Sequence, residues 1–116
     1  MIKSKVVDKK NSAHYTWGDA CHSWVLANSV GLSVKQEVMP PGSKEVLHFH
    51  HKAQQFFYVL SGEATFYSGT HKFTLKPLQG IAVHPMNKHY IANETKSDIE
   101  FLVISQPTIG NDRVNV

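Results

Sequence analysis

The sequence predicts an all-β fold: a small closed or double-layered β structure with little helix. Groups of turn-forming residues recur about every eight to twelve residues, a spacing typical of a β-sandwich or β-barrel. The segments between these turns are rich in aromatic and β-branched residues, and no stretch of ten or more residues has the apolar period of a helix. We expect closure because apolar strands would otherwise leave exposed edges.

The first predicted strand, GLSVKQEVM at 31–39, alternates with period two. Leu32, Val34, Gln36 and Val38 share one face, and Ser33, Lys35 and Glu37 share the other. The PPG turn at 40–42 ends this strand, and VLHFH at 46–50 predicts the next. Any helix is expected only as a turn within 10–24.

The second half of the chain predicts four more strands separated by loops. Residues 55–69 predict two strands around a turn at Ser61–Gly62, and residues 71–76 and 98–105 predict the others, with Pro107 ending the last. We expect loops at 77–80 and 84–88.

The length of 116 residues suits one domain, so we expect a single domain over 1–116 with 1–12 as a flexible or arm-like segment. No apolar run could span a membrane, and the N-terminus lacks the apolar region of a secretory signal. Because Cys21 is the single cysteine, no intrachain disulfide is possible and an oxidising compartment is not required. We therefore expect a cytoplasmic location and no membrane partner.

The net charge of +3 does not indicate nucleic-acid binding. Four lysines within residues 3–10, less Asp8, account for all of it, and the eight basic and eight acidic residues that follow cancel. Arg113 is the single arginine, so bidentate contacts to phosphates or bases are poorly supplied.

Three histidines in four positions, HFHH at 48–51, are the strongest chemical signal. On a strand, residues i and i+2 point the same way, so His48 and His50 project together. Two imidazoles on one face are half of a metal site. Gln55 and His89 are candidates to complete it in an antiparallel fold.

These residues stand at the spacing of a known motif: Gly, five residues, His-x-His, three or four residues, Glu, six residues, Gly. The chain matches it from Gly42 through His48 and His50 to Gly62, with Gln55 in place of the Glu. A second motif is matched more weakly by HPMNKHYIAN at 84–93. His89 and Asn93 are kept there, while His84 and Met86 replace a Pro and a Gly. The chain thus resembles the cupin superfamily of jelly-roll β-barrels (double-stranded β-helices).

The resemblance implies that one divalent metal is bound by His48, His50, Gln55 and His89. Three imidazoles and one oxygen suit Fe, Mn, Co, Ni, Cu or Zn. Gln55 could instead hydrogen-bond a metal-bound water, or Gln54 could be the residue that points inward. A neutral amide in place of a carboxylate predicts weaker metal binding and a stronger Lewis acid.

Other residues are weaker candidates. His84 could be a catalytic proton shuttle at the barrel mouth, although a surface loop position is the simpler interpretation. Tyr58 and Tyr67 are the remaining possible bases. The inward aromatic positions from Phe57 onward are mainly core and only secondarily a pocket.

Three functions fit the resemblance. The first is a metal-dependent enzyme acting on a small organic molecule, with dioxygenase, isomerase or lyase chemistry. The second is a non-catalytic small-molecule-binding or sensor module, and the third is a metal that only stabilises the barrel. A homodimer is expected, because small cupins commonly pair.

Overall fold

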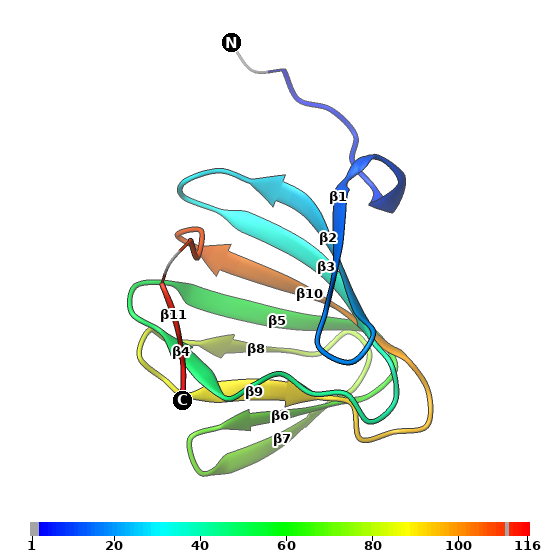
Figure 1. The fold of residues 1–116 in the computed structure, drawn as a ribbon, viewed down its shortest axis with the longest axis vertical. Helices are drawn as coiled ribbons and strands as arrows, with labels where there is room; N and C mark the ends of the chain where they lie inside the picture. Colours follow the sequence, from blue (N-terminus) through cyan, green and yellow to red (C-terminus); the bar gives the residue numbers. More distant parts are fainter. Residues whose placement is uncertain (1–2, 111) are drawn as a thin grey trace.

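The computed structural model describes residues 3–110 and 112–116. Its described strands form two antiparallel sheets (Figure 1). The larger sheet has the order β1-β2-β3-β10-β5-β8 and the smaller has the order β11-β4-β9-β6-β7. The strands of the larger sheet are β1 (Ala13–Trp17), β2 (Cys21–Asn28), β3 (Ser33–Met39), β10 (Ile99–Gln106), β5 (Gln54–Ser61) and β8 (Gly80–Val83). Those of the smaller sheet are β11 (Arg113–Asn115), β4 (His48–His50), β9 (His89–Ala92), β6 (Ala64–Ser68) and β7 (His71–Leu75). The predicted all-β, double-layered fold is confirmed.

The N-terminal part differs from the sequence-based expectation. A helical turn was expected within 10–24, but residues 13–28 form the β1–β2 hairpin, which was not predicted. The helical turn among the described residues is the 3-10 segment η1 (Lys9–Asn11), capped by the Asp8 carboxylate. The hairpin was not predicted because β1 is almost fully exposed and so lacks the alternation of a half-buried strand.

The structure also contains three short strands that were not predicted: β8, β9 and β11. β8 pairs with β5 and β9 pairs with β6, on either side of the expected loop at 84–88. Beyond Pro107, β11 returns to pair with β4. At three or four residues each, these strands are too short for a clear period.

The segment before β1 leaves the body of the molecule (Figure 1). Within it, the Lys9 ammonium lies 4.4 Å from the centre of the Trp24 ring and forms an ion pair with Glu100. The single-domain and arm-like assignments stay predictions, and residues 1–2 of the expected arm lie outside the described residues. None of the helices in the described ranges has the length and apolar character needed to cross a bilayer.

The interior between the sheets has an apolar half and a polar half, because the inward side chains of the long strands are apolar at one end and polar at the other. On β10 the inward positions run from Ile99 and Phe101 to Ser105, and all three are buried. Its neighbour β5 runs antiparallel, from Gln55 to Val59. The register places Ser105 beside Gln55. The apolar ends pack into the core, while the polar ends gather at the other end of the barrel.

Candidate metal centre and cavity

Three histidines meet at the polar end of the barrel. His48 and His50 alternate with the partly buried Phe49 on β4, so both point inward as the HFH spacing predicts. The β4–β9 register places His89 directly opposite His48. All three side chains are almost fully buried, with relative exposures of 1, 2 and 1%. The fold thus brings together imidazoles that are about forty residues apart in sequence.

The three imidazoles are close enough to share one ion. One donor nitrogen from each lies within 4.8 Å of the other two. The ring centroids of His48 and His89 are 4.4 Å apart, and His50 lies 5.1 Å from His48 and 5.8 Å from His89. A metal at about 2.1 Å from each nitrogen needs donor separations of about 3.0–3.4 Å, so a modest contraction would complete the site.

Backbone carbonyls orient two of the rings. His48 Nδ1 donates to the carbonyl oxygen of Val46 at 2.7 Å, and His89 Nδ1 donates to that of Asn87 at 2.8 Å. Because each Nδ1 carries the proton, each Nε2 presents a lone pair toward the interior. His50 differs: neither of its buried ring nitrogens has a hydrogen-bond partner among the described residues. An unpaired, buried imidazole of this kind is free to ligate a metal ion.

Burial keeps the histidines neutral. It lowers the pKa of His48 to about 3, reinforced by the positive charge of Arg113 and opposed by the Val46 carbonyl. Burial and the neighbouring His89 lower the pKa of His50 to about 4, and burial also lowers the pKa of His89. Neutral imidazole is the form that binds metals, so near pH 7 no proton competes for these nitrogens.

Gln55 lies beside the histidines, whereas Gln54 is exposed and hydrogen-bonds Gln106. The Gln55 amide donates to Ser105 Oγ at 3.1 Å, which leaves its Oε1 atom 3.0 Å from His89 Nε2. In this orientation both facing atoms are acceptors, because the His89 proton is already on Nδ1. Two acceptors about 3.0 Å apart match adjacent ligands of one cation.

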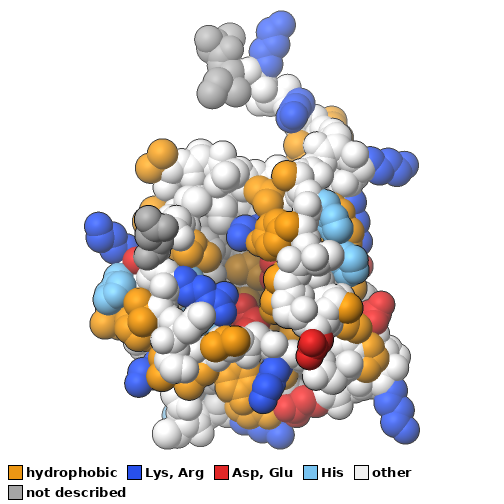
Figure 2. Space-filling model, in the orientation of Figure 1, with side chains coloured by type: hydrophobic (Ala, Val, Ile, Leu, Met, Phe, Trp, Pro, Cys, Tyr) orange, Lys and Arg blue, Asp and Glu red, His pale blue; other side chains and the backbone are white. Residues whose placement is uncertain are grey.

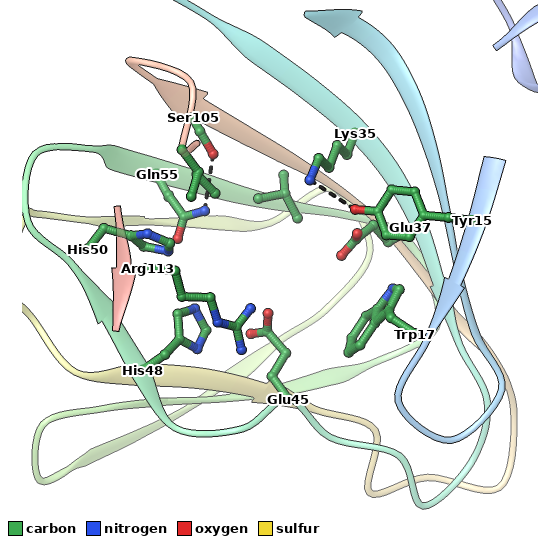
Figure 3. Close-up of a pocket in the computed structure, with 12 residues that line it drawn as sticks. Tyr15, Trp17, Lys35, Glu37, Glu45, His48, His50, Gln55, Ser105 and Arg113 are labelled. Atoms are coloured by element: carbon green, nitrogen blue, oxygen red, sulfur yellow. Dashed lines mark hydrogen bonds between the residues drawn. The ribbon is translucent and has the colours of Figure 1, made fainter. Parts of the chain in front are cut away.

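A cavity of about 80 Å³ adjoins the histidines (Figure 3). Its size is well below the roughly 300 Å³ at which drug-sized sites begin, so it suits a ligand of few atoms. Figure 2 shows the molecule hollowed on this face, with charged side chains at the border of the hollow. The lining residues are Tyr15, Trp17, Lys35, Glu37, Glu45, His48, His50, Gln55, Val103, Ser105, Ile109 and Arg113.

Sequence reasoning missed four charged residues of this cavity: Lys35, Glu37, Glu45 and Arg113. Arg113 stands opposite His50 in the β11–β4 register and therefore projects to the same side of the sheet. Glu37 lies on β3, on the face that carries Ser33 and the buried Met39. The sequence showed that Glu37 shares a face with Ser33, but alternation alone does not reveal which face of a strand points into the barrel.

The other candidates lie elsewhere. His84 is exposed and does not line the cavity, so its role as a proton shuttle stays a prediction without geometric support. Phe57 and Phe66 are fully buried in the apolar core and do not line the cavity. Tyr58 points to the outer face of β5, and Tyr67 hydrogen-bonds Glu94 at 2.5 Å on the surface.

Comparison with known families agrees with this architecture. The family model described as Cupin domain matches residues 35–105, which is more than half of the chain and includes both motifs. The chain is a cupin. Among curated proteins, this cupin is similar to an uncharacterised protein of Methanocaldococcus jannaschii. The two are 26% identical over 91 residues, covering 78% of this chain and 73% of the relative.

Solved structures share the fold at low sequence identity. The polyketide cyclase RemF of Streptomyces resistomycificus has a TM-score of 0.83 at 15% identity, over 98% of this cupin and 86% of RemF. A double-stranded β-helix protein of Klebsiella pneumoniae has a TM-score of 0.81 at 18% identity, over 98% of both chains. A sugar phosphate isomerase of Silicibacter pomeroyi has a TM-score of 0.80 at 20% identity, over 90% of this cupin and 76% of that chain. At these identities the likeness is one of fold alone.

Proposed function

We propose that this cupin binds one divalent transition metal through His48, His50 and His89, with the Gln55 carbonyl oxygen as a fourth ligand. The observation that carries the proposal is the cluster of three buried, neutral imidazoles, one of which has no hydrogen-bond partner for either nitrogen. Burying unpaired polar atoms costs free energy, and a bound ion would offset that cost.

The set of donor atoms limits which metals can bind. Three imidazole nitrogens and an amide oxygen suit Fe, Mn, Co, Ni, Cu or Zn better than Mg or Ca, which prefer oxygen ligands. None of the four ligands carries a formal charge, so the ion would keep close to its full double charge. When bound, it would act as a Lewis acid that polarises an oxygen of a small organic ligand.

We propose further that the protein is a metal-dependent enzyme acting on a small organic molecule. The ligands cluster at one end of the cavity, and charged, aromatic and aliphatic side chains line the rest of it (Figure 3). Known relatives of the fold include an isomerase and a cyclase, which supports chemistry of the isomerase or lyase type and leaves dioxygenase chemistry as a further option. The alternative is a non-catalytic small-molecule-binding or sensor module, or a metal that only stabilises the barrel.

Metal analysis of protein purified without a nickel column tests the first step, and we expect close to one transition metal per chain. A His50→Gln variant should lose the metal, whereas His71→Gln, at an exposed position of β7, should retain it. A wild-type protein that binds no metal under metal-replete conditions would refute the proposal. If metal-free protein unfolds entirely, the stabilising role is favoured over the enzyme.

A second experiment separates the chemistries. Oxygen uptake by the Fe(II) form with dicarbonyl and catechol-like compounds would favour a dioxygenase. Tightly held zinc without uptake would favour isomerase or lyase chemistry.

We also propose a homodimer through the outer face of the larger sheet. Val34, Ile104 and Phe56 lie side by side across β3, β10 and β5, and all three are incompletely buried. Phe56 is 39% exposed, which is high for an aromatic side chain on a strand that is paired on both sides. Light scattering should report a dimer for the wild type and a monomer for Phe56→Glu, and a monomeric wild type would refute the dimer.

A further inference from the structure

The end of the cavity away from the histidines holds two carboxyl groups that come from different sheets (Figure 3). Glu37 projects from β3 of the larger sheet. Glu45 belongs to the segment before β4, which lies along β9: Glu45 N donates to Ile91 O at 3.0 Å, and Ile91 N donates to Glu45 Oε1 at 3.1 Å. The backbone of β3 on one side, and of the segment before β4 on the other, therefore places both carboxyl groups in the same cavity.

Glu37 has no ion-pair partner that explains its burial, and its cross-strand neighbour in the β2–β3 register is the neutral Ser23. It is 6% exposed, and no described residue forms a hydrogen bond or an ion pair with its carboxylate within the usual distances. The Ser23 hydroxyl lies close enough to lower the pKa of Glu37 but makes no hydrogen bond by geometry. A largely buried carboxylate that lines a cavity without a countercharge is costly, so a role in ligand chemistry is favoured over a role in folding.

Two further unpaired groups line the same cavity. The buried ring nitrogens of His50 have no partner among the described residues, and neither does the buried indole N–H of Trp17. His50 is 2% exposed and lies at the metal end. Unsatisfied groups at both ends of one small cavity indicate that a ligand completes it.

The two carboxyl groups differ in their surroundings. Burial and the nearby Glu37 charge raise the pKa of Glu45 to about 8, against the hydrogen bond from Ile91. Burial also raises the pKa of Glu37, but the positive charge of Lys35 and the Ser23 hydroxyl oppose it. Two nearby carboxyl groups tend to hold one proton between them, and here Glu45, whose pKa is about 8, keeps it near pH 7.

We propose that Glu37 and Glu45 are the acid–base pair of this cupin, and that its substrates are small α-hydroxycarbonyl compounds. This inference rests on the proposed metal-dependent enzyme, because the metal would polarise the carbonyl oxygen. Of the chemistries proposed above, the inference favours isomerisation over lyase or dioxygenase chemistry. The cavity volume of about 80 Å³ limits the reacting part to a few carbon atoms.

The reaction balances as two proton transfers. Glu37 takes the proton from the carbon beside the carbonyl: the C–H bond breaks, an O–H bond forms on Glu37, and the electron pair moves to the carbonyl oxygen to give an enediolate. Glu45 then donates its proton to the former carbonyl carbon while the hydroxyl proton shifts between the two oxygens. The product is the isomeric hydroxycarbonyl compound, and transfer of the proton from Glu37 to Glu45 restores the starting state.

The test measures hydrogen exchange at carbon. Zinc-loaded protein in D₂O is incubated with dihydroxyacetone and, because Arg113 and Lys35 border the cavity, with the anionic probe hydroxypyruvate. Exchange is followed by proton NMR against the same zinc concentration in buffer. We expect exchange with the wild type and a loss of at least about 100-fold in Glu37→Gln and in Glu45→Gln, at unchanged zinc content. Glu63→Gln, at an exposed turn outside the cavity, is the matched control and should exchange like the wild type.

The outcomes separate the two proposals. A wild type that binds no metal overturns the proposed function and this inference with it. A wild type with full zinc content but no exchange above the buffer, or variants at both carboxyls that exchange normally, overturns the acid–base pair alone. If Glu37→Gln does not fold, the test uses Glu45→Gln and the conservative Glu37→Asp variant instead. Glu37→Asp should keep part of the exchange activity.

Discussion

Replacing His50 with Gln should make the metal-free protein less sensitive to acid. Burial lowers the pKa of His50 to about 4, against about 6.5 in an unfolded chain. Between these values the unfolded chain binds a proton that the folded chain does not. The stability that neutral His50 contributes is therefore fully present above pH 6.5 and is lost as the pH falls toward 4.

The size of the effect follows from the two pKa values. From pH 7 to pH 5, proton binding stabilises an unfolded histidine by about 1.9 kcal/mol and the folded His50 by less than about 0.1 kcal/mol. The wild type should thus lose about 1.8 kcal/mol through this residue alone. Glu45 acts in the opposite direction, because its raised pKa of about 8 makes the folded state gain stability as the pH falls toward 4.5. Comparing the variant with the wild type cancels that contribution.

The assay is guanidinium unfolding at pH 7 and pH 5 in the presence of a chelator. Between these two values, the free energy of unfolding of His50→Gln should fall by about 1.8 kcal/mol less than that of the wild type. His71→Gln, at an exposed position, should fall by the same amount as the wild type. If the wild type and His50→Gln fall equally, within about 0.5 kcal/mol, His50 is not buried in its neutral form and the basis for the metal site is lost.

Three further predictions concern the site and its supporting turns. Gln55→Glu should tighten metal retention by about 10-fold or more in competition with a chelator, because a carboxylate adds charge beside His89; equal retention would show that residue 55 does not bind the ion. Gly62→Ala should lower the free energy of unfolding by about 2–4 kcal/mol, since φ is +78° and the new Cβ would lie 2.7 Å from the Asp98 carbonyl oxygen. Gly69→Ala, with φ +59° and open space around it, should cost only about 1 kcal/mol, and similar losses for the two would refute the steric argument. Met86→Gly should stabilise the protein by about 1 kcal/mol in thermal unfolding because Met86 has φ +72°, and a gain in Met86→Ala as well would contradict this cause.

Short-range patterns predicted much of this molecule. The turn spacing and apolar alternation predicted the fold class and most of the long strands. The HFH spacing predicted that His48 and His50 share a face, because period two is a property of any extended chain. The match to the cupin motifs then indicated Gln55 and His89 as their companions, and the structure places both beside them.

The charged half of the cavity could not be predicted in the same way. Glu37 stands in an alternating segment at a position that a solvent-facing residue would also occupy, and Glu45 and Arg113 lie in segments without any period. Their shared position depends on how β3, the segment before β4, and β11 close around the interior. Burial, which raises the pKa of Glu45 and lowers those of the histidines, is likewise a property of the closed barrel.

Which side chains share a strand face, and which spacings suit a metal, follow from local backbone geometry and can therefore be predicted from the residues alone. Which face is inside, which distant residues meet, and which polar groups are left unpaired are set by the closed barrel. Those outcomes depend on long-range pairing between strands, and neighbours along the chain carry no information about it.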